Sequence, residues 1–264
     1  IEVKGLIGRG AMGEVYEAVD KTIGRRVALK RLRPELLASP ADLEGLLAEA
    51  RVVASLKHEN LVAIYSVERE AGQVYLALEF VDGGTLARLI KERGRLGWPD
   101  ALSIFSSVCS ALDYAHSQRV VHRDLKPANI MIARSGEVKV MDFGIAFTAQ
   151  KSISRLTRAA AWGTPPYMAP EQELGGVSAG VDLFAISVCL YEMLTGELPF
   201  KGPNFLAQKG EGLYISPSSM LTRLPQGVDA FFKTALAPEP SKRFSTAASL
   251  LAAAPALLLS LALL

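Results

Sequence analysis

The sequence predicts an α+β fold built from a small, mainly antiparallel β part and a larger, mainly helical part. Residues 1–80 consist mostly of short strand-like runs separated by turn residues. A breaker at residues 82–84, Asp-Gly-Gly, follows them, and we expect the boundary there, with residues 81–86 as the connection. Beyond it, stretches with helical spacing dominate up to residue 264.

The first part is expected to contain five short strands and one helix. Residue type and alternation place the strands at 2–7, 15–19, 27–30, 61–67 and 74–80, with a hairpin-like turn at 70–73. Ser39 can cap a helix whose first position suits Pro40, because proline lacks an N–H that would stay unbonded there. Apolar residues then recur at helical spacing as far as Ala54.

The second part is expected to be helical in three main places. The pattern favours helices at 98–117, 181–194 and 228–237, with Pro99 near the start of the first and Gly196 after the second. Residues 202–224 are rich in Gly, Pro and Ser, so we expect little regular helix there.

Composition is that of one large domain or two intimately packed lobes. Half of the 264 residues are apolar, which allows a sizeable core without disulfides or metals. The net charge of +2, without a long basic run, gives no indication of a nucleic-acid partner. Cys109 and Cys189 lie far apart in apolar helical surroundings, so we expect buried free thiols rather than zinc ligands.

Both ends of the sequence have unusual features. The chain starts at Ile1, with neither an initiator methionine nor a signal peptide, which indicates a fragment of a longer protein. Residues 245–264 contain no charged side chain but are interrupted by Pro255. Two interpretations stay open: a final helix packed on the domain, or the start of a membrane anchor, which needs ~20 apolar residues.

A glycine-rich turn is the first candidate site. Gly8, Gly10 and Gly13 lie between two predicted strands, and glycine lets backbone N–H groups approach phosphate oxygens. A dinucleotide-binding fold would need these glycines to open a helix, whereas Val15 and its neighbours read as a strand. The turn also lacks the Lys-Ser/Thr of a P-loop, and a plain hairpin turn stays the alternative.

Charged residues that follow apolar strands supply the remaining candidates. Lys30 ends an apolar strand, where lysine is unusual unless paired, and Glu49 on the following helix is the expected partner. A lysine that extends to the surface is the alternative. Residues 122–129 form a dense polar cluster between apolar runs, and Asp142 follows a β-branched strand. Burying so many charged groups is costly unless they are paired, so we expect these residues to form a functional site.

In order, spacing and context these pieces resemble the signature set of the protein kinases. Residues 163–171 resemble the end of a kinase activation segment, and Asp182 stands where the family has an aspartate that braces the catalytic loop. Arg243 matches the arginine that pairs with the closing glutamate, here Glu171. The amino-acid sequences of the motifs are most similar to those of bacterial Hanks-type serine/threonine kinases.

The resemblance implies a single bilobal protein kinase domain, with residues 1–80 as the N-lobe, 81–86 as the hinge and 87–264 as the C-lobe. The implied activity is transfer of the γ-phosphate of ATP to protein hydroxyls, with ATP and Mg²⁺ as cofactors and Mn²⁺ as a substitute. Lys126 and Thr164 are typical of serine/threonine kinases, and Ile145 goes with a preference for threonine acceptors.

The resemblance also implies the role of each site residue. The catalytic residues would be Asp124 as acceptor of the substrate proton, Lys126 on the transferred phosphoryl group, Lys30 on the α- and β-phosphates, and Glu49 as the partner of Lys30. The metal ligands would be Asn129 and Asp142. The nucleotide would be bound by Gly8, Gly10, Gly13, Val15, Ala28, Lys30, Leu78 as gatekeeper, backbone groups of Glu79 and Val81, Met131 and Asp142, with Thr85 near the ribose. A structural spine would contain Val53, Ile64, His122 and Phe143.

Regulation by phosphorylation is implied by Arg123 beside the catalytic aspartate, because a loop phosphate would supply its counter-ion. Among the hydroxyls of residues 148–157 we favour Thr157, with Thr164 as a further regulatory position; a plain basic loop is the alternative. Autophosphorylation in trans through a homodimer is the expected route.

The expected partners are protein substrates and ATP, without nucleic acid, and with a membrane only if the terminal segment is an anchor. The kinase domain is expected to be cytoplasmic. A pseudokinase scaffold is the main rival, but it would normally lack Lys30, Asp124 or Asp142, which are all present. A small-molecule kinase is disfavoured by the peptide-binding sequence at 163–171.

Overall fold

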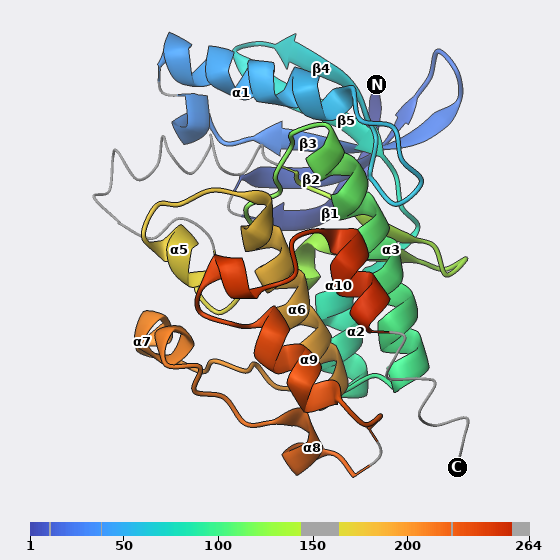
Figure 1. Ribbon diagram of the computed structural model, residues 1–264. Helices are drawn as coiled ribbons and strands as arrows, with labels where there is room; N and C mark the ends of the chain where they lie inside the picture. The colour runs from blue at the N-terminus through green and yellow to red at the C-terminus, as the bar shows by residue number, and fades with distance from the viewer. Residues whose placement is uncertain (11, 38, 144–163, 223, 255–264) are drawn as a thin grey trace.

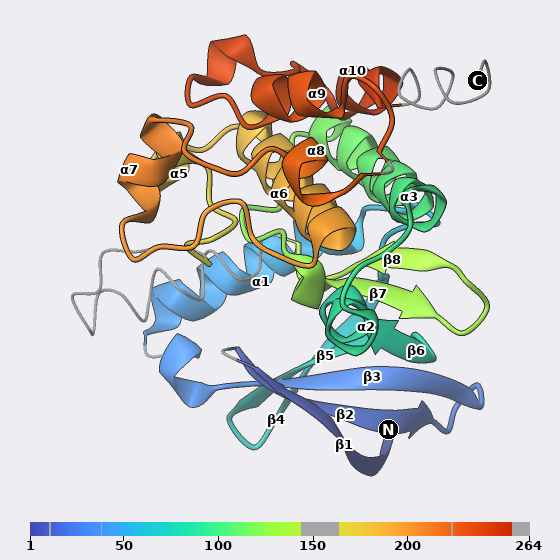
Figure 2. The same cartoon turned by 90° about the horizontal axis from the view of Figure 1, so that it is seen from below.

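The computed structural model describes residues 1–10, 12–37, 39–143, 164–222 and 224–254. These residues form a lobe built on a five-stranded sheet with one helix across it, and a larger helical lobe. A three-stranded sheet lies between the large sheet and the helices (Figures 1 and 2). The predicted α+β, bilobal fold is thereby confirmed.

All four neighbouring strand pairs of the large sheet are antiparallel, in the order β1-β2-β3-β5-β4. Its strands are β1 (Glu2–Gly10), β2 (Gly13–Asp20), β3 (Arg25–Leu32), β4 (Ile64–Glu70) and β5 (Gln73–Glu79). The small sheet contains β6 (Gly83–Thr85), β7 (Ile130–Ala133) and β8 (Val138–Val140), also paired antiparallel.

The connection between β4 and β5 is the predicted hairpin turn. Its two central residues, Ala71 and Gly72, have φ angles of 48° and 78°, and Glu70 pairs with Gln73 across them. Two consecutive positive φ angles suit a two-residue turn whose twist matches that of the flanking strands.

The strand β4 begins later than the sequence indicates. Leu61 and Val62, expected in this strand, instead contact β8: Leu61 forms a parallel bridge with Val140, and Val62 N donates to Val140 O at 2.9 Å. These apolar residues therefore join the two lobes. Their apolar character alone does not distinguish this role from membership of the large sheet.

The helix of the small lobe, α1 (Pro40–Ala54), begins at proline as predicted and follows the short 3₁₀ turn η1 (Pro34–Leu37). In Figure 1 it lies across the sheet. On one side of this helix, Leu46 and Ala50 are fully buried, whereas Val52 on its other side is half exposed. The one-sided burial shows which face of α1 packs against the sheet.

The helical lobe is centred on two long helices, α3 (Trp98–Ser117) and α6 (Ala179–Thr195), close to the predicted ranges. The other helices are α2 (Leu86–Arg93), α5 (Pro170–Glu173), α7 (Phe205–Gly210), α8 (Pro217–Met220), α9 (Val228–Ala235) and α10 (Ala247–Ala253), with the 3₁₀ turns η2 (Pro127–Asn129) and η3 (Pro240–Lys242). Helices α7 and α8 lie in the stretch where little helix was expected.

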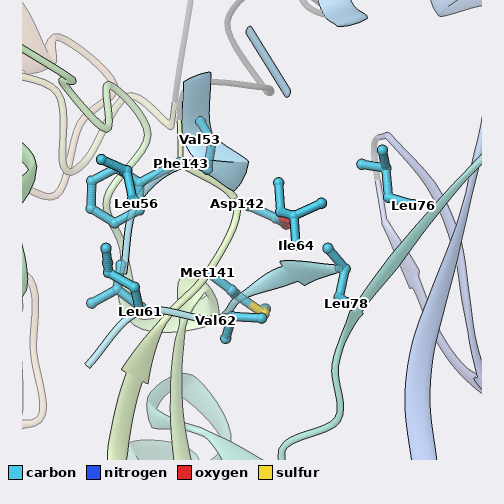
Figure 3. A pocket seen from close by; sticks show the side chains of 11 residues that line it. Val53, Leu56, Leu61, Val62, Ile64, Leu76, Leu78, Met141, Asp142 and Phe143 are labelled. Carbon is cyan, nitrogen blue, oxygen red and sulfur yellow. The ribbon is translucent and has the colours of Figure 1, made fainter. Parts of the chain in front are cut away.

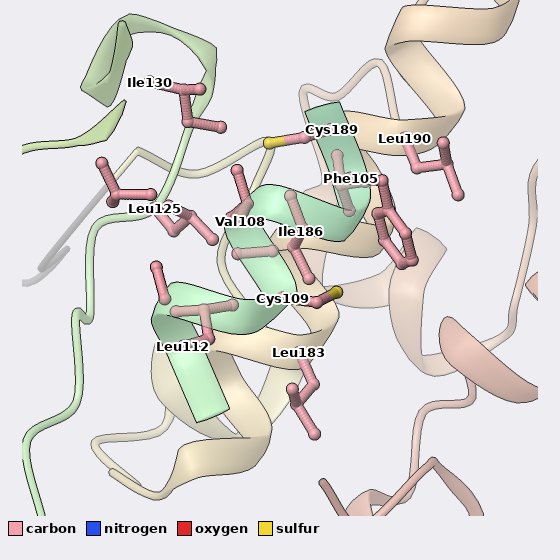
Figure 4. Packing of buried hydrophobic residues seen from close by; sticks show 14 of the residues in the cluster. Phe105, Val108, Cys109, Leu112, Leu125, Ile130, Leu183, Ile186, Cys189 and Leu190 are labelled. Carbon is pink, nitrogen blue, oxygen red and sulfur yellow. The ribbon is translucent and has the colours of Figure 1, made fainter. Parts of the chain in front are cut away.

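The core of this lobe forms where α3 packs against α6 (Figure 4). Phe105 and Val108 of α3 and Ile186 of α6 are completely buried. Burying such side chains contributes roughly 1.5–3 kcal/mol each relative to leaving them in water. The lobe is thus a rigid support for the loops that emerge from its helices and from β7 and β8.

Cys109 and Cys189 are free and buried in this core, at 1% and 0% exposure. Burial raises the pKa of both thiols well above the ordinary value, so the reactive thiolate is scarce at neutral pH. We expect neither thiol to react with Ellman's reagent in the folded protein and both to react after denaturation in guanidinium chloride. Rapid reaction of either thiol in the native protein would contradict this burial.

Helix α10 packs against α3, and Ala248 N donates to Asp113 Oδ1 at 3.3 Å. The first part of the uncharged terminal segment is therefore a packed helix, while residues 255–264 lie outside the described residues. Within the described part of the chain, none of the helices combines the length and the apolar character needed to cross a bilayer.

Candidate active site

One face of the large sheet carries the residues predicted to surround a nucleotide. Cross-strand neighbours share a face, and Val15 pairs with Lys30 while Ala28 pairs with Leu78. Lys30 and Ala28 are two positions apart on β3, so all four side chains lie on the same side. The opposite face carries a separate apolar cluster of Ala18, Val27, Leu29 and Ala77.

The glycine-rich turn joins β1 to β2, and its last glycine is required by the backbone. Gly13 has a φ of 154°, and a Cβ there would lie 1.9 Å from Arg31 O on β3. No other residue fits without moving the strand. Gly8 and Gly10 meet no such obstacle, since a Cβ at Gly10 would have open space around it.

Lys30 forms an ion pair across the two lobes. Its side chain is 7% exposed, and Nζ lies 2.6 Å from Asp142 Oδ1. Burial alone would raise the pKa of Asp142, but the charge and hydrogen bond of Lys30 outweigh it and keep that pKa below its usual value. Asp142 is therefore ionised at neutral pH. Its φ of 63°, costly for a non-glycine residue, indicates a conformation imposed by function.

The expected ion pair between Lys30 and Glu49 is not formed in this structure. Among the described residues Lys30 pairs with Asp142, and Glu49 Oε1 instead lies 3.6 Å from Arg123 Nη1. The sequence prediction used only the order of the residues, whereas the choice of partner depends on how α1 is placed relative to the catalytic loop.

The polar cluster predicted to be catalytic gathers around Asp124, which is 9% exposed. Asp124 Oδ2 accepts from Lys126 Nζ at 2.6 Å, and Asp124 Oδ1 accepts from Thr164 Oγ1 at 3.0 Å. Lys126 Nζ also donates to Thr164 Oγ1 at 2.7 Å. The site thus holds a carboxylate, a cation and a hydroxyl in one hydrogen-bonded triangle.

Asn129 completes the cluster and fits the role of a cation ligand. Its Nδ2 donates to Asp124 O at 2.8 Å, which leaves the amide oxygen as the atom for a cation. Met141 N donates to Asn129 O at 2.9 Å, which holds Asn129, just before β7, next to the segment after β8 that bears Asp142. An amide oxygen and a carboxylate suit Mg²⁺. The described residues contain no group of three His, Cys, Asp or Glu that could hold a metal without phosphate oxygens.

The loop bearing Asp124 is braced from α6 by Asp182, which is 1% exposed. Asp182 Oδ2 accepts from His122 N at 2.8 Å, and Oδ1 accepts from Arg123 N at 2.9 Å. Arg123 has a φ of 69°, and these bonds help to hold the backbone in that conformation. His116 Nε2 lies 2.7 Å from Asp182 Oδ2 and adds a contact from α3.

Three of the four predicted spine residues line one small cavity together with Asp142. Val53, Ile64 and Phe143 line a cavity of about 20 Å³, which Leu78 also lines (Figure 3). The ring of His122 lies 4.5 Å from that of Phe143, and its Nε2 donates to Met141 O at 3.0 Å. His122 is therefore a packing residue that orients the loop, as expected.

Several residues predicted to contact the nucleotide lie at or near the connection between the lobes. Glu79 N donates to Ala63 O at 2.8 Å, so the carbonyl of Glu79 is the backbone group that could accept from an adenine. Its carboxylate lies 2.6 Å from Lys139 Nζ. Met131 pairs with Thr85 on the small sheet, and the Thr85 hydroxyl caps α2 by accepting from Arg88 N. Val81 lies between β5 and β6.

Residues 164–171, the run that begins at Thr164 beside the cluster, are anchored at their C-terminal end by a second ion pair. Glu171 accepts two hydrogen bonds from the guanidinium of Arg243, at 2.7 and 2.8 Å, as the sequence implied. Burial and bidentate geometry distinguish this pair from the exposed ion pairs of the surface, which contribute little.

A family model described as "Protein kinase domain" matches residues 1–254. The chain belongs to the protein kinase family. The described site agrees with this membership, because Lys30 pairs with Asp142 across the lobes and Asp124, Lys126 and Asn129 gather beside Thr164.

Known kinases resemble the chain in sequence and in structure. The probable serine/threonine-protein kinase PknB of Bifidobacterium longum is 39% identical over 256 residues, which are 92% of this chain and 37% of that protein. The PknI kinase domain of Mycobacterium tuberculosis has a TM-score of 0.77 at 26% identity, covering 97% of this chain and 95% of that one. The Rad53 complex with AMP-PNP has a TM-score of 0.78 at 30% identity, covering 94% and 63%.

Similarity to bacterial members is confirmed by these relatives. This chain spans little more than a third of the PknB length, so it corresponds to the kinase domain of a longer relative. Ile145, Thr157 and the other hydroxyl-bearing residues of the predicted activation loop lie outside the described residues. Their roles stay predictions.

Sequence reasoning left two residues of this kinase site without a role. Gln172 Nε2 donates to Arg123 O at 2.5 Å, tying α5 to the catalytic loop. Lys209 of α7 is completely buried and contacts the run that contains Thr164. Lys209 lies between Gly- and Pro-rich segments, where no hydrophobic periodicity indicates which residues are buried. Its structural role becomes visible only in the folded structure, where it is completely buried.

Proposed function

We propose that the chain is a serine/threonine protein kinase domain that transfers the γ-phosphate of ATP to protein hydroxyls. The observation that carries the proposal is the Asp124 carboxylate, held between Lys126 and the Thr164 hydroxyl near the ion pair of Lys30 with Asp142. The nucleotide is suggested by the apolar sheet face and by the AMP-PNP in the Rad53 complex.

In the reaction, an oxygen of the acceptor hydroxyl forms a bond to the γ-phosphorus while the bond from that phosphorus to the β–γ bridging oxygen breaks. ADP leaves, and the hydroxyl proton passes to Asp124. A bound Mg²⁺ supplies charge neutralisation for the phosphate oxygens, and Asn129 and Asp142 are the residues that would hold it.

The remaining residues position charge. Lys126, 2.6 Å from Asp124 in this structure, can move onto the transferred phosphoryl group when the acceptor hydroxyl approaches Asp124. Lys30, now on Asp142, would bind the α- and β-phosphates. Catalysis by such positioned charges needs no covalent intermediate.

The acceptor is inferred to be serine or threonine. The named relative PknB is a serine/threonine kinase, and the contact of Lys126 with Thr164 joins the two residues that indicated this class. A preference for threonine, inferred from Ile145, and a cytoplasmic location stay predictions.

Regulation is inferred from Arg123. Its guanidinium lies 3.6 Å from Glu49, while Lys30 pairs with Asp142. We infer that a phosphate on Thr157 attracts Arg123, so that Glu49 can turn to Lys30. Autophosphorylation in trans within a homodimer is the proposed source of that phosphate.

The test of the proposed activity is incubation with ATP and Mg²⁺, followed by phosphosite mapping, beside the Lys30→Met variant. We expect phosphothreonine or phosphoserine in the unmodified chain, on itself and on added myelin basic protein, and none in Lys30→Met. Nucleotide binding without any phosphate transfer would instead support the pseudokinase alternative. Replacing Mg²⁺ by Mn²⁺ in the same assay tests the choice of metal.

Thr157 is tested by the same mapping and by the Thr157→Ala variant, with Ser152→Ala as the matched loop control. We expect loss of the main phosphosite and a slower activation phase in Thr157→Ala alone. Equal behaviour of both variants would remove Thr157 from the regulatory proposal while leaving the catalytic one intact.

A further inference from the structure

A fully buried lysine lies next to the site on a short helix that the catalytic proposal does not use. Lys209 of α7 has a side-chain exposure of 0%. Its Nζ donates to Pro165 O and to Glu173 Oε1, both at 2.5 Å. The Phe205 ring lies 5.5 Å from the same nitrogen, with its face towards the charge.

A lysine is rarely buried completely, because removing its charge from water is costly unless partners compensate. Burial lowers the pKa of Lys209, while the hydrogen bond and charge of Glu173 act in the opposite direction. A surface lysine could pair with Glu173 without such a cost. The buried position therefore indicates that the contact with the carbonyl of Pro165 is the feature being maintained.

Pro165 is the neighbour of Thr164, whose hydroxyl bonds to both Asp124 and Lys126. A turn follows directly, in which Tyr167 N donates to Thr164 O at 2.9 Å. A chain of bonded groups thus runs from Lys209 through Pro165 and Thr164 to the proposed proton acceptor. Displacing Pro165 by an ångström would displace the Thr164 hydroxyl as well.

Other anchors hold the same run farther from the reacting groups. Tyr167 donates to Glu192 of α6 at 2.7 Å, and Glu171 binds Arg243. These bonds fix the run against the helical core. Lys209 differs because it holds the start of the run, beside Thr164, and does so from α7, on the outer side of the lobe (Figure 2).

We propose that Lys209 is a positioning residue for the protein substrate: through Pro165 it holds residues 164–167 in the shape that receives the acceptor segment. This inference rests on the proposed kinase activity. Because Lys209 acts on the peptide-binding run and not on the nucleotide face, its loss should raise KM for the protein acceptor much more than KM for ATP.

The test compares Lys209→Met with Lys201→Met, a matched change at a lysine whose side chain is 58% exposed in an ion pair with Glu197. Myelin basic protein is the acceptor probe, and ATP hydrolysis without acceptor is measured in parallel. We expect KM for myelin basic protein to rise by about tenfold or more in Lys209→Met, because a buried carbonyl loses a charged donor. KM for ATP and acceptor-free hydrolysis should change by less than about threefold, and Lys201→Met should match the unmodified chain.

Two further variants separate positioning from mere folding. Lys209→Arg keeps a cation and several donors, so it should recover part of the acceptor affinity. If Lys209→Met fails to fold, Lys209→Met combined with Glu173→Gln decides, because it leaves no unpaired buried charge yet still lacks the bond to Pro165. The double variant should retain ATP binding and show the raised acceptor KM.

The outcomes are distinguishable from failure of the proposed function. An unmodified chain that transfers no phosphate refutes the kinase proposal itself. An active unmodified chain whose folded Lys209 variants keep the original acceptor KM, or lose ATP and acceptor affinity equally, overturns the role of Lys209 alone.

Discussion

Asp124→Asn should lower kcat for phosphorylation of a protein acceptor by about a thousandfold, within the range typical for loss of a general base. The amide cannot take the hydroxyl proton, and its single oxygen can keep only one of the two hydrogen bonds that the separate carboxylate oxygens accept from Lys126 and Thr164. The change therefore removes the proton acceptor while keeping the size and shape of the side chain. Steady-state kinetics with myelin basic protein, at saturating ATP, measure it.

The control for this change is Asp100→Asn, the same substitution at an acid whose side chain is 66% exposed on α3. It should leave kcat unchanged. Binding of ATP, measured by the thermal shift that the nucleotide produces, should be similar in all three proteins. If Asp124→Asn kept more than about a tenth of the activity, Asp124 would be excluded as the proton acceptor and would have only a structural role.

The sequence was sufficient to predict that the candidate catalytic residues lie close together, because the signals are local. Asp124, Lys126 and Asn129 lie within six positions, between two apolar runs that must be buried, so they emerge together just before the start of β7. The register of the sheet follows from alternation for a similar reason. Val15, Ala28 and Lys30 share a face because their strands pair in the only way that buries Val27 and Leu29 on the other side.

The partners of charged groups could not be predicted as well, because they depend on how elements far apart in the chain are placed. Glu49 lies near Arg123, which is 74 positions farther along the chain. Glu49 and Asp142 both carry a carboxylate that could pair with Lys30, and the sequence alone does not distinguish between them. The placement of α1, which packs against β4, is a tertiary feature that the sequence pattern does not specify.

Lys209 was missed for a related reason. Its two acceptors, Pro165 and Glu173, precede it by 44 and 36 positions, and nothing within the six-residue helix α7 indicates burial. The Gly- and Pro-rich neighbourhood even argued against a helix there. Tertiary packing against α5 stabilises this short element, which would be too short to persist alone.

Arg243→Met should cause the largest loss of stability of any single change considered, about 3–5 kcal/mol of unfolding free energy. The Arg243 side chain is 2% exposed, and its guanidinium binds Glu171 through two nitrogens. It also donates to Ala237 O at 2.6 Å and to Pro238 O at 2.8 Å, and lies 4.8 Å from the centre of the Phe184 ring. Methionine fills similar volume but leaves Glu171 and both carbonyls without their donor.

Lys242→Met is the matched control, because Lys242 is the adjacent residue and pairs with Glu239 at 2.7 Å while its side chain is 67% exposed. Exposed pairs contribute about 0–1 kcal/mol, so its melting temperature should barely move, whereas that of Arg243→Met should fall on the order of 10 °C. Combining Arg243→Met with Glu171→Gln should recover part of the loss, since no unpaired carboxylate is left. Equal melting temperatures for the two single variants would mean that the pair orients the acceptor-binding run without stabilising the fold, and the loss would then appear in KM for the acceptor instead.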